Sequence, residues 1–171
     1  EFIKMVNDIE LSSGWTPVGS STDARFKGTF DGGGKLLTVP AGGLPLFGYV
    51  GGATIKNLNV YGTQIAGYGL INHFDELDEN AADKGVSISG ITLKSGSSTL
   101  KSGLLGSEFT TNPYAGSTRS SEAHISGCTI ESGVVIGYNG DQNYIGSIAG
   151  RMQGSITGCT SNATVKGVNY V

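Results

Sequence analysis

Four segments of the chain share one pattern, and this pattern decides the fold: Ala53-Thr-Ile-Lys-Asn-Leu-Asn-Val60, Val86-Ser-Ile-Ser-Gly-Ile-Thr-Leu93, Ala123-His-Ile-Ser-Gly-Cys-Thr-Ile130 and Gly154-Ser-Ile-Thr-Gly-Cys-Thr-Ser161. Each has isoleucine at its third position, asparagine or glycine at its fifth, and leucine, isoleucine or cysteine at its sixth. The isoleucines are Ile55, Ile88, Ile125 and Ile156, and successive ones are 31 to 37 residues apart. A repeat of this length indicates similar structural units that stack on one another and share a core.

The repeated segments have the pattern of β-strands, because none carries apolar residues at i, i+3, i+4 and i+7 over the length of a helix. Alternate side chains of a strand share a face, yet the apolar residues Ile88 and Ile91 are three positions apart. A bend at the intervening Gly90 explains this step, because glycine and asparagine tolerate a positive φ. The equivalent residues are Asn57, Gly127 and Gly158. We therefore expect parallel strands about 4.8 Å apart, with the four isoleucines in one interior column.

A second apolar element, set among glycines, recurs between these strands, as Gly43-Leu-Pro-Leu-Phe-Gly48, Gly67-Tyr-Gly-Leu-Ile71, Ser102-Gly-Leu-Leu-Gly106 and Ile145-Gly-Ser-Ile-Ala-Gly150. One repeat cannot enclose a core alone, whereas a stack of repeats can. The sequence therefore predicts one all-β domain over residues 1–171, a parallel β-helix. Residues 1–40 would form its N-terminal cap and first rung, and residues 41–171 its repeats.

The two ends of the stack carry different signals. Trp15 and Pro17 precede the repeats and are expected to close the N-terminal end, because an open end would expose apolar surface and unpaired strands. Phe26, Phe30 and Leu37 fit inward positions of the first rung, and the run Asp31-Gly-Gly-Gly34 predicts a tight turn. The segment 154–171 resembles a rung with no cap after it, so we expect the chain to be part of a longer protein.

The composition excludes several classes of protein. Glycine accounts for 29 of the 171 residues and proline for 4, which favours many tight turns and excludes collagen. Charged residues make up 15%, too few for a disordered chain. The net charge is −3 without a basic stripe, so no nucleic-acid partner is expected. No apolar run reaches the 18 or so residues of a membrane-spanning helix, so no membrane insertion is expected.

The two cysteines occupy one position of the repeat. Cys128 and Cys159 stand where Leu58 and Ile91 stand in the earlier segments. This predicts a core column of small hydrophobic side chains. Neighbouring strands are also close enough for a disulfide between the two residues. Both interpretations stay open from the sequence.

An ordered series of motifs in the first part of the chain carries a family resemblance. The motifs are Asn7-Asp-Ile-Glu-Leu11, Gly14-Trp-Thr-Pro-Val-Gly19, Phe26-Lys-Gly-Thr-Phe-Asp-Gly-Gly-Gly34, Leu46-Phe-Gly48 and Ile55-Lys-Asn-Leu-Asn-Val60. They closely resemble the GLUG-type repeat regions of large bacterial surface or secreted proteins, over most of residues 7–171. Such regions occur in adhesin-like proteins and in the non-catalytic N-terminal parts of some IgA-cleaving metallopeptidases.

This resemblance implies a right-handed parallel β-helix at the bacterial cell surface or outside the cell. It also implies a non-catalytic structural or adhesive module, so the chain is not expected to be an enzyme. The partners would be a host protein, a glycan or other domains of the parent protein.

An acidic stretch over residues 74–85 interrupts the repeats and holds five of the 14 acidic residues. One interpretation is a short exposed helix over residues 75–83, which Asp75 would cap. The other is a structural calcium site formed by Asp75, Asp78, Asn80 and Asp83, because clustered carboxylates and carbonyls suit that cation. No other cofactor is expected.

Two long connections are the predicted binding loops. Loops on a rigid scaffold often carry recognition residues, and the segments 107–121 and 137–144 contain Tyr114, Tyr138 and Tyr144. These aromatic rings could stack on a sugar or anchor a protein partner. A carbohydrate- or host-protein-binding domain is therefore the first alternative function.

The second alternative function is a truncated polysaccharide-acting β-helix enzyme. Such chemistry needs a carboxylate or another base on neighbouring rungs. Here Glu108 and Glu131 have no acidic equivalents in the adjacent repeats. His73 and His124 are the only histidines, and the sequence pairs neither with a nucleophile.

Overall fold

A computed structural model describes residues 1–21, 23–74, 85–105, 123–137, 145–150 and 154–167. In these ranges the chain is all-β and contains no helix. The strands are β1 (Phe2–Lys4), β2 (Ile9–Glu10), β3 (Phe26–Val39), β4 (Phe47–Gly62), β5 (Ile71–Phe74), β6 (Val86–Leu93), β7 (Ser98–Thr99), β8 (Ala123–Ser126), β9 (Thr129–Ile130), β10 (Val135–Ile136), β11 (Gly154–Thr157), β12 (Thr160–Ser161) and β13 (Thr164–Val165).

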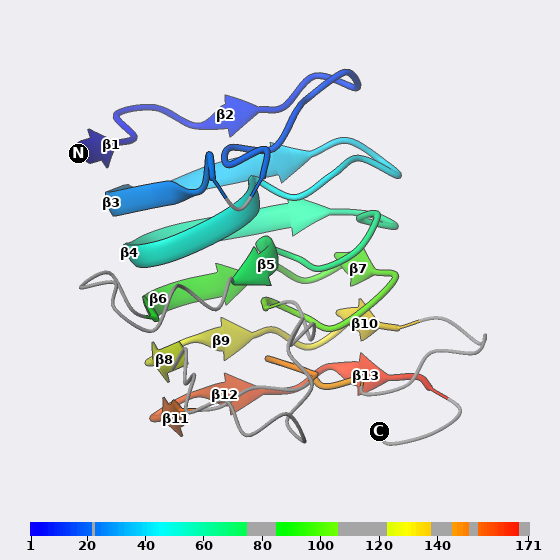
Figure 1. Cartoon of the computed structure of the whole chain (residues 1–171). Coiled ribbons are helices and arrows are strands. Elements are labelled where there is room, and N and C mark those ends of the chain that lie inside the picture. The colour runs from blue at the N-terminus through cyan, green and yellow to red at the C-terminus, as the bar shows by residue number, and fades with distance from the viewer. Residues whose placement is uncertain (22, 75–84, 106–122, 138–144, 151–153, 168–171) are drawn as a thin grey trace, which may run out of the picture.

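The strands form a ten-stranded sheet and a three-stranded sheet, and every described pairing is parallel. The main path of the large sheet runs β1-β3-β4-β6-β8-β11, and the small sheet runs β13-β10-β7. Figure 1 shows the chain descending layer by layer, in sequence order, from the N-terminus to the C-terminus. We call each return of the chain to the large sheet a pass.

The predicted isoleucine column is confirmed. Ile55 pairs with Ile88, Ile88 with Ile125, and Ile125 with Ile156, all in parallel register. Phe30 and Ile3 continue the column toward the N-terminus. Ile55 and Ile88 are fully buried, whereas Ile156 is 46% exposed because β11 lies at the edge of the described sheet. A single apolar column therefore runs through six successive passes.

The predicted bend within each repeat is also confirmed. Asn57, Gly90, Gly127 and Gly158 have φ values of 55°, 59°, 57° and 59°. This left-handed conformation turns the strand so that the residue two before the bend and the residue after it both point inward. Ile88 and Ile91, on the two sides of Gly90, are accordingly both buried.

The first full pass makes the same bend differently. The predicted tight turn over residues 31–34 is instead a bulge inside the continuous strand β3, where the register with β4 shifts between Asp31 and Lys35. Gly33 and Gly34 have φ values of 60° and 71°, and the Gly33 amide donates to Asp31 Oδ1 at 2.9 Å. The extra residues enlarge the bend without ending the strand. Phe26, Phe30 and Leu37 are buried, as the sequence predicted.

The asparagine at the bend provides a direct test of this geometry. Asn57→Gly should keep nearly wild-type stability, because glycine adopts the same φ in the three later repeats. Asn57→Val should lose about 1–2 kcal/mol, because a β-branched residue is strained in the left-handed region. Urea unfolding of the two variants measures the difference. Equal stability of the valine and glycine variants would contradict the assigned bend.

The glycine-flanked apolar segments form a column of their own. Isolated parallel bridges join Val18 to Phe47, Ile71 to Leu105, and Leu105 to Ala149, and strand β5 pairs Ile71 with Phe47. Trp15, just before this column, packs against the core, and its Nε1 donates to the Pro45 carbonyl oxygen at 3.2 Å. Buried side chains from both sheets and from this column belong to one hydrophobic core. Ahead of it, Phe2, Val6 and Ile9 of the first pass are exposed.

Candidate functional site

The site residues predicted from the sequence lie outside the described residues. They are Tyr114, Tyr138 and Tyr144, the calcium ligands Asp75, Asp78, Asn80 and Asp83, the helix over residues 75–83, and the loops 107–121 and 137–144 except Gly137. These predictions stay predictions. Among the described residues, no group of three or more histidine, cysteine, aspartate or glutamate side chains is placed to hold a metal ion.

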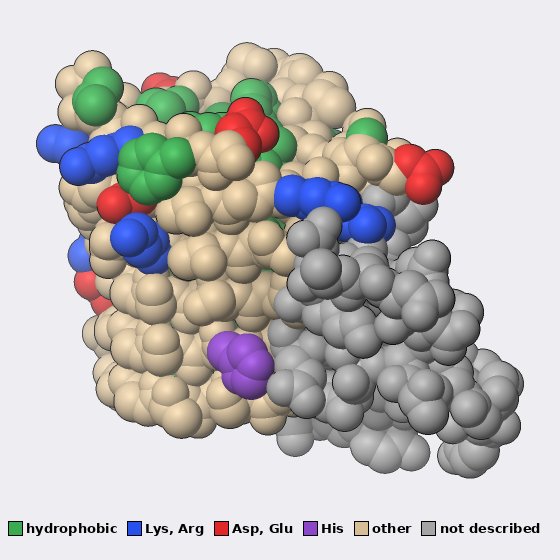
Figure 2. Space-filling model, turned by 60° about the vertical axis from the view of Figure 1, so that its left-hand side comes forward, with side chains coloured by type: hydrophobic (Ala, Val, Ile, Leu, Met, Phe, Trp, Pro, Cys, Tyr) green, Lys and Arg blue, Asp and Glu red, His purple; other side chains and the backbone are tan. Residues whose placement is uncertain are grey.

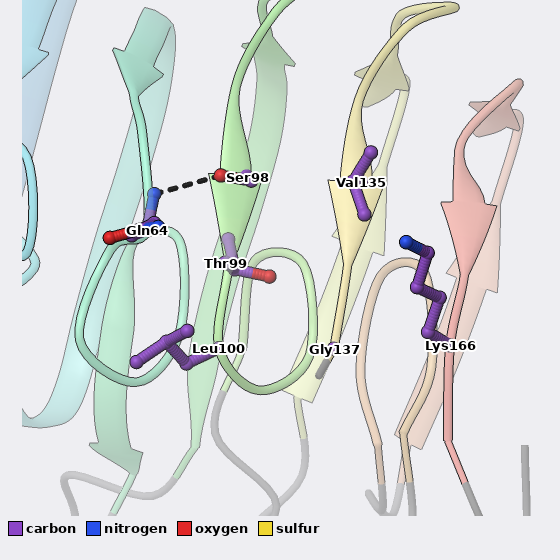
Figure 3. A pocket seen from close by; sticks show the side chains of 7 residues that line it. All are labelled: Gln64, Ser98, Thr99, Leu100, Val135, Gly137 and Lys166. Carbon is purple, nitrogen blue, oxygen red and sulfur yellow. Dashed lines mark hydrogen bonds between the residues drawn. The ribbon is translucent and has the colours of Figure 1, made fainter. Parts of the chain in front are cut away.

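The described surface contains a groove over the outer side of the three-stranded sheet. It has a volume of about 470 Å³. It is lined by Gln64, Ser98, Thr99, Leu100, Val135, Gly137 and Lys166. Figure 3 shows that these side chains come from successive passes, so the groove runs across the strands rather than along one of them.

The short strands of the small sheet explain which side chains reach this groove. Alternate residues of a strand face opposite sides, and here Thr99 and Ile136 are buried while Ser98 and Val135 are half-buried. Ser98 pairs with Val135 in register, so their outward side chains lie next to each other (Figure 3). Leu100, just after β7, is 38% exposed and provides an apolar contact surface beside the polar side chains.

Gln64 is the most unusual residue of the groove. Its φ is 51°, a conformation that residues other than glycine adopt rarely and at a cost of about 1 kcal/mol or more. The backbone amide of Gln64 donates to Ser98 Oγ at 2.8 Å, and the backbone amide of Ile65 donates to the Ser98 carbonyl oxygen at 2.9 Å. Ser98 therefore holds the chain in this conformation at the edge of the groove. Such outliers gather at functional sites.

A second hollow of about 310 Å³ adjoins the groove. It is lined by Ala66, Gly67, Tyr68, Asn72, His73, Leu100 and Lys101, so Leu100 borders both. Lys101 Nζ lies 5.3 Å from the centre of the Tyr68 ring, and the His73 ring stacks on Tyr49 at 4.6 Å between ring centres. This region offers an amide, an imidazole and an ammonium group close to an exposed leucine. That combination suits a polar ligand with an apolar face.

Glu131, the described carboxylate considered for catalysis, is held in its ionised form. Its Oε1 accepts a hydrogen bond from Lys94 Nζ, and its Oε2 accepts one from the Ser95 amide at 2.8 Å. The hydrogen bond from Lys94, followed by the one from the Ser95 amide, lowers the pKa of Glu131. A general acid in glycoside cleavage needs the opposite shift. Glu131 therefore acts as a structural link between neighbouring passes.

The structure brings together one pair that sequence reasoning missed. His124 of β8 and Ser155 of β11 are paired in register, and His124 Nδ1 lies 2.9 Å from Ser155 Oγ. Both side chains are exposed on the outer face of the large sheet. Figure 2 shows that charged side chains gather over the first passes on this face and that few lie over the later ones. The repeat contained the signal, because aligning Ile125 with Ile156 places Ser155 directly beside His124.

The Glu131 link predicts a specific pH dependence. Because the folded-state pKa is below the ordinary value of 4.5, the link stabilises the fold above that pH and is lost as the pH falls through the folded-state pKa. Wild type should therefore exceed Glu131→Gln in stability at neutral pH, by a small margin since the pair is solvent-exposed. Urea unfolding of both proteins between neutral pH and about pH 3 measures how this margin shrinks. A margin that stays constant over this range, or one equal to that of Glu10→Gln, would contradict the assignment.

Comparisons of the chain with models of protein families, with curated proteins and with solved structures found no match. Within the described residues, no helix is long and apolar enough to cross a membrane.

Proposed function

We propose that this chain is a right-handed parallel β-helix that serves as a non-catalytic structural or adhesive module of a bacterial surface or secreted protein. We also propose that the chain belongs to the GLUG-type repeat family, which its sequence resembles. The single observation that carries it is the in-register column of Ile55, Ile88, Ile125 and Ile156. Identical positions stacked over a continuous core favour a stiff rod, which suits the display of other parts of a protein.

The distribution of side chains supports a passive role. Most inward positions of the paired strands are apolar, and the outward positions beside the isoleucine column are largely hydroxyls, as in Ser87, Ser89 and Ser126. Glu131, the described carboxylate considered above for polysaccharide cleavage, is engaged by Lys94 and Ser95. The handedness follows the general rule for parallel crossover connections.

A cleavage assay and a localisation assay test this proposal together. The purified chain, incubated with a panel of neutral and acidic polysaccharides, should release no new reducing ends. An antibody against the chain should label intact, unpermeabilised cells of the organism that makes it, or its culture medium. Cleavage that disappears in Glu131→Gln would favour the polysaccharide-acting enzyme. Labelling confined to permeabilised cells would contradict the surface location.

The second candidate function is recognition of a glycan or a host protein through the groove. The observation that favours it is the strained conformation of Gln64 in a groove that Leu100 and Lys166 also line. Backbone strain of this kind persists where the surrounding structure fixes a residue for a task. The side chains supply an amide, a hydroxyl and a cation for hydrogen bonds. The predicted loop residue Tyr138 directly follows Gly137, which lines the groove.

A glycan array and a panel of immobilised host extracellular proteins test this second candidate. Binding should fall at least about tenfold in the double variant Gln64→Ala/Lys166→Ala, because two polar contacts are removed. The matched control is Ser87→Ala, which removes an exposed hydroxyl from the large sheet. Loss of binding in Tyr114→Ala or Tyr138→Ala, without loss in the groove variant, would place the site in the loops instead. Absence of binding to both panels would leave the structural role as the function.

A further inference from the structure

Cys128 and Cys159 lie side by side on neighbouring passes. The residues that flank them are in parallel register, Ser126 with Thr157 and Thr129 with Thr160. The Cys128 amide is 3.3 Å from Cys159 Sγ, although the two residues are 31 positions apart in the sequence. Both side chains are reduced in the structure. The sequence is compatible with both a core column and a disulfide at these two positions.

The two side chains take the same orientation. Cys128 Sγ lies 3.5 Å from the Ser126 carbonyl oxygen, and Cys159 Sγ lies 3.5 Å from the Thr157 carbonyl oxygen. Each sulfur thus contacts the carbonyl two residues before it, so the sulfurs are stacked on adjacent strands. Paired strands are about 4.8 Å apart, and Cα atoms joined by a disulfide are about 4.4–6.8 Å apart. Closure therefore needs side-chain rotation and no separation or slip of the strands.

We propose that Cys128 and Cys159 form a redox pair that closes to a disulfide when the protein meets a small-molecule disulfide such as oxidised glutathione. In the first step the Cys159 thiolate attacks a glutathione sulfur, which breaks the glutathione disulfide and releases one glutathione thiolate. In the second step the Cys128 thiolate attacks Cys159 Sγ and releases the second glutathione thiolate. The two glutathione thiolates take up the two protons lost by the cysteines. The protein dithiol is oxidised, and one glutathione disulfide is reduced to two thiols.

Accessibility sets the order of these steps. Cys128 is fully buried, whereas Cys159 is half-buried on the last described pass, so the oxidant reaches Cys159 first. Burial raises the pKa of the Cys128 thiol to about 11. The second step is therefore slow at neutral pH and accelerates as the pH rises, because the thiolate is the attacking species.

The disulfide would act at one edge of the described stack. Strands β11 and β12 each have one described neighbour, β8 and β9 respectively, and Ile156 is half-exposed. The same pass continues through β13 to Lys166, which lines the groove. A covalent bond between Cys128 and Cys159 would fasten this pass to the one before it. Lys166 would then be held more firmly in its place along the groove under oxidising conditions than under reducing ones.

Mass spectrometry of the full chain tests the proposal. The protein is reduced, freed of reductant, incubated with oxidised glutathione, and then denatured and treated with iodoacetamide. We expect a monomer that has lost two hydrogen atoms and takes up no alkyl group, with a peptide containing both cysteines after proteolysis. We also expect the melting temperature to rise by roughly 5–10 °C on oxidation, because the bond closes a loop of 31 residues. Hydrogen exchange should slow in β11 and β12.

Two variants keep the result interpretable. Cys159→Ser changes a half-buried residue and should fold, and it should give one alkylated thiol and no oxidation-dependent change in melting temperature. Cys128→Ala should likewise show no oxidation-dependent rise in melting temperature, but its Cys159 should carry one glutathione in place of an alkyl group. Stable glutathione addition at Cys159 in wild type, disulfide-linked dimers, or two free thiols after prolonged incubation at pH 9 would each overturn the proposal.

Discussion

Replacing Ile88 by alanine should lower the free energy of unfolding by about 3–5 kcal/mol, at the upper end of the range for truncating a buried aliphatic side chain. Ile88 is fully buried and has Ile55 on one side and Ile125 on the other. The neighbouring passes are fixed by their own backbone pairing, so they cannot collapse into the cavity. The lost contacts are therefore not recovered. Urea unfolding followed by circular dichroism measures the change.

The column supplies its own matched control. Ile156→Ala makes the same chemical change at the same position of the repeat, but Ile156 is 46% exposed and has a described neighbour on one side. Its expected loss is below about 1.5 kcal/mol, since little apolar surface leaves the core. Equal losses at the two positions would mean that Ile88 is not enclosed between two passes, which would contradict the stacked arrangement.

Replacing Gly103 by alanine should destabilise the protein by about 2–4 kcal/mol. A Cβ at this position would overlap the Ser147 carbonyl oxygen of the next pass. The same contact recurs one pass earlier, where a Cβ on Gly69 would overlap the Gly103 carbonyl oxygen and the Gly69 amide donates to that oxygen at 2.8 Å. Glycine is required here by the close approach of two backbones, so alanine would force the passes apart.

Gly14→Ala is the control for this prediction. A Cβ on Gly14 would have no atom within 4 Å, so the variant should remain within about 0.5 kcal/mol of wild type. Thermal unfolding of the two variants measures the contrast. A Gly103→Ala protein as stable as Gly14→Ala would show that the passes are not in contact along the glycine-flanked column.

The sequence predicted the repeated strand and its bend because both depend on local chemistry. Each repeat needs an isoleucine that is buried and a glycine or asparagine that adopts a positive φ. These residue types therefore recur at fixed positions of the repeat, where the sequence shows them. The column of Ile55, Ile88, Ile125 and Ile156 and the bends at Asn57, Gly90, Gly127 and Gly158 follow from this signal. The parallel register then follows, because a shift by one residue would turn every apolar side chain outward.

The pairing of the small sheet could not be predicted in the same way. Ile65 bridges to Thr99 and Ile136 pairs with Val165. The distance from the repeated isoleucine to these positions varies from pass to pass, since the intervening turns differ in length. Moreover, the inward position is isoleucine or valine in three passes and threonine in one. The buried Thr99 is accommodated because its Oγ1 donates to the Lys101 carbonyl oxygen at 2.7 Å.

The groove was missed for a related reason. Its residues lie on four passes and share no motif, and the strained φ of Gln64 depends on Ser98 of another pass. Nothing in the run Thr63-Gln-Ile-Ala66 marks Gln64 for such a conformation. The tyrosine and calcium predictions relied on loop composition, and composition does not determine where a loop folds relative to the scaffold.

The order of strand pairing has a mechanical consequence. In the described large sheet the main path adds each pass next to the preceding one, so passes further apart are not joined by strand pairing. A force applied along the stack would load the backbone hydrogen bonds between passes in series, and detachment would proceed by peeling at an end. An oxidised Cys128–Cys159 bridge would move the first rupture away from the last described pass. Such a stack would yield in small, repeated steps under tension instead of failing at once.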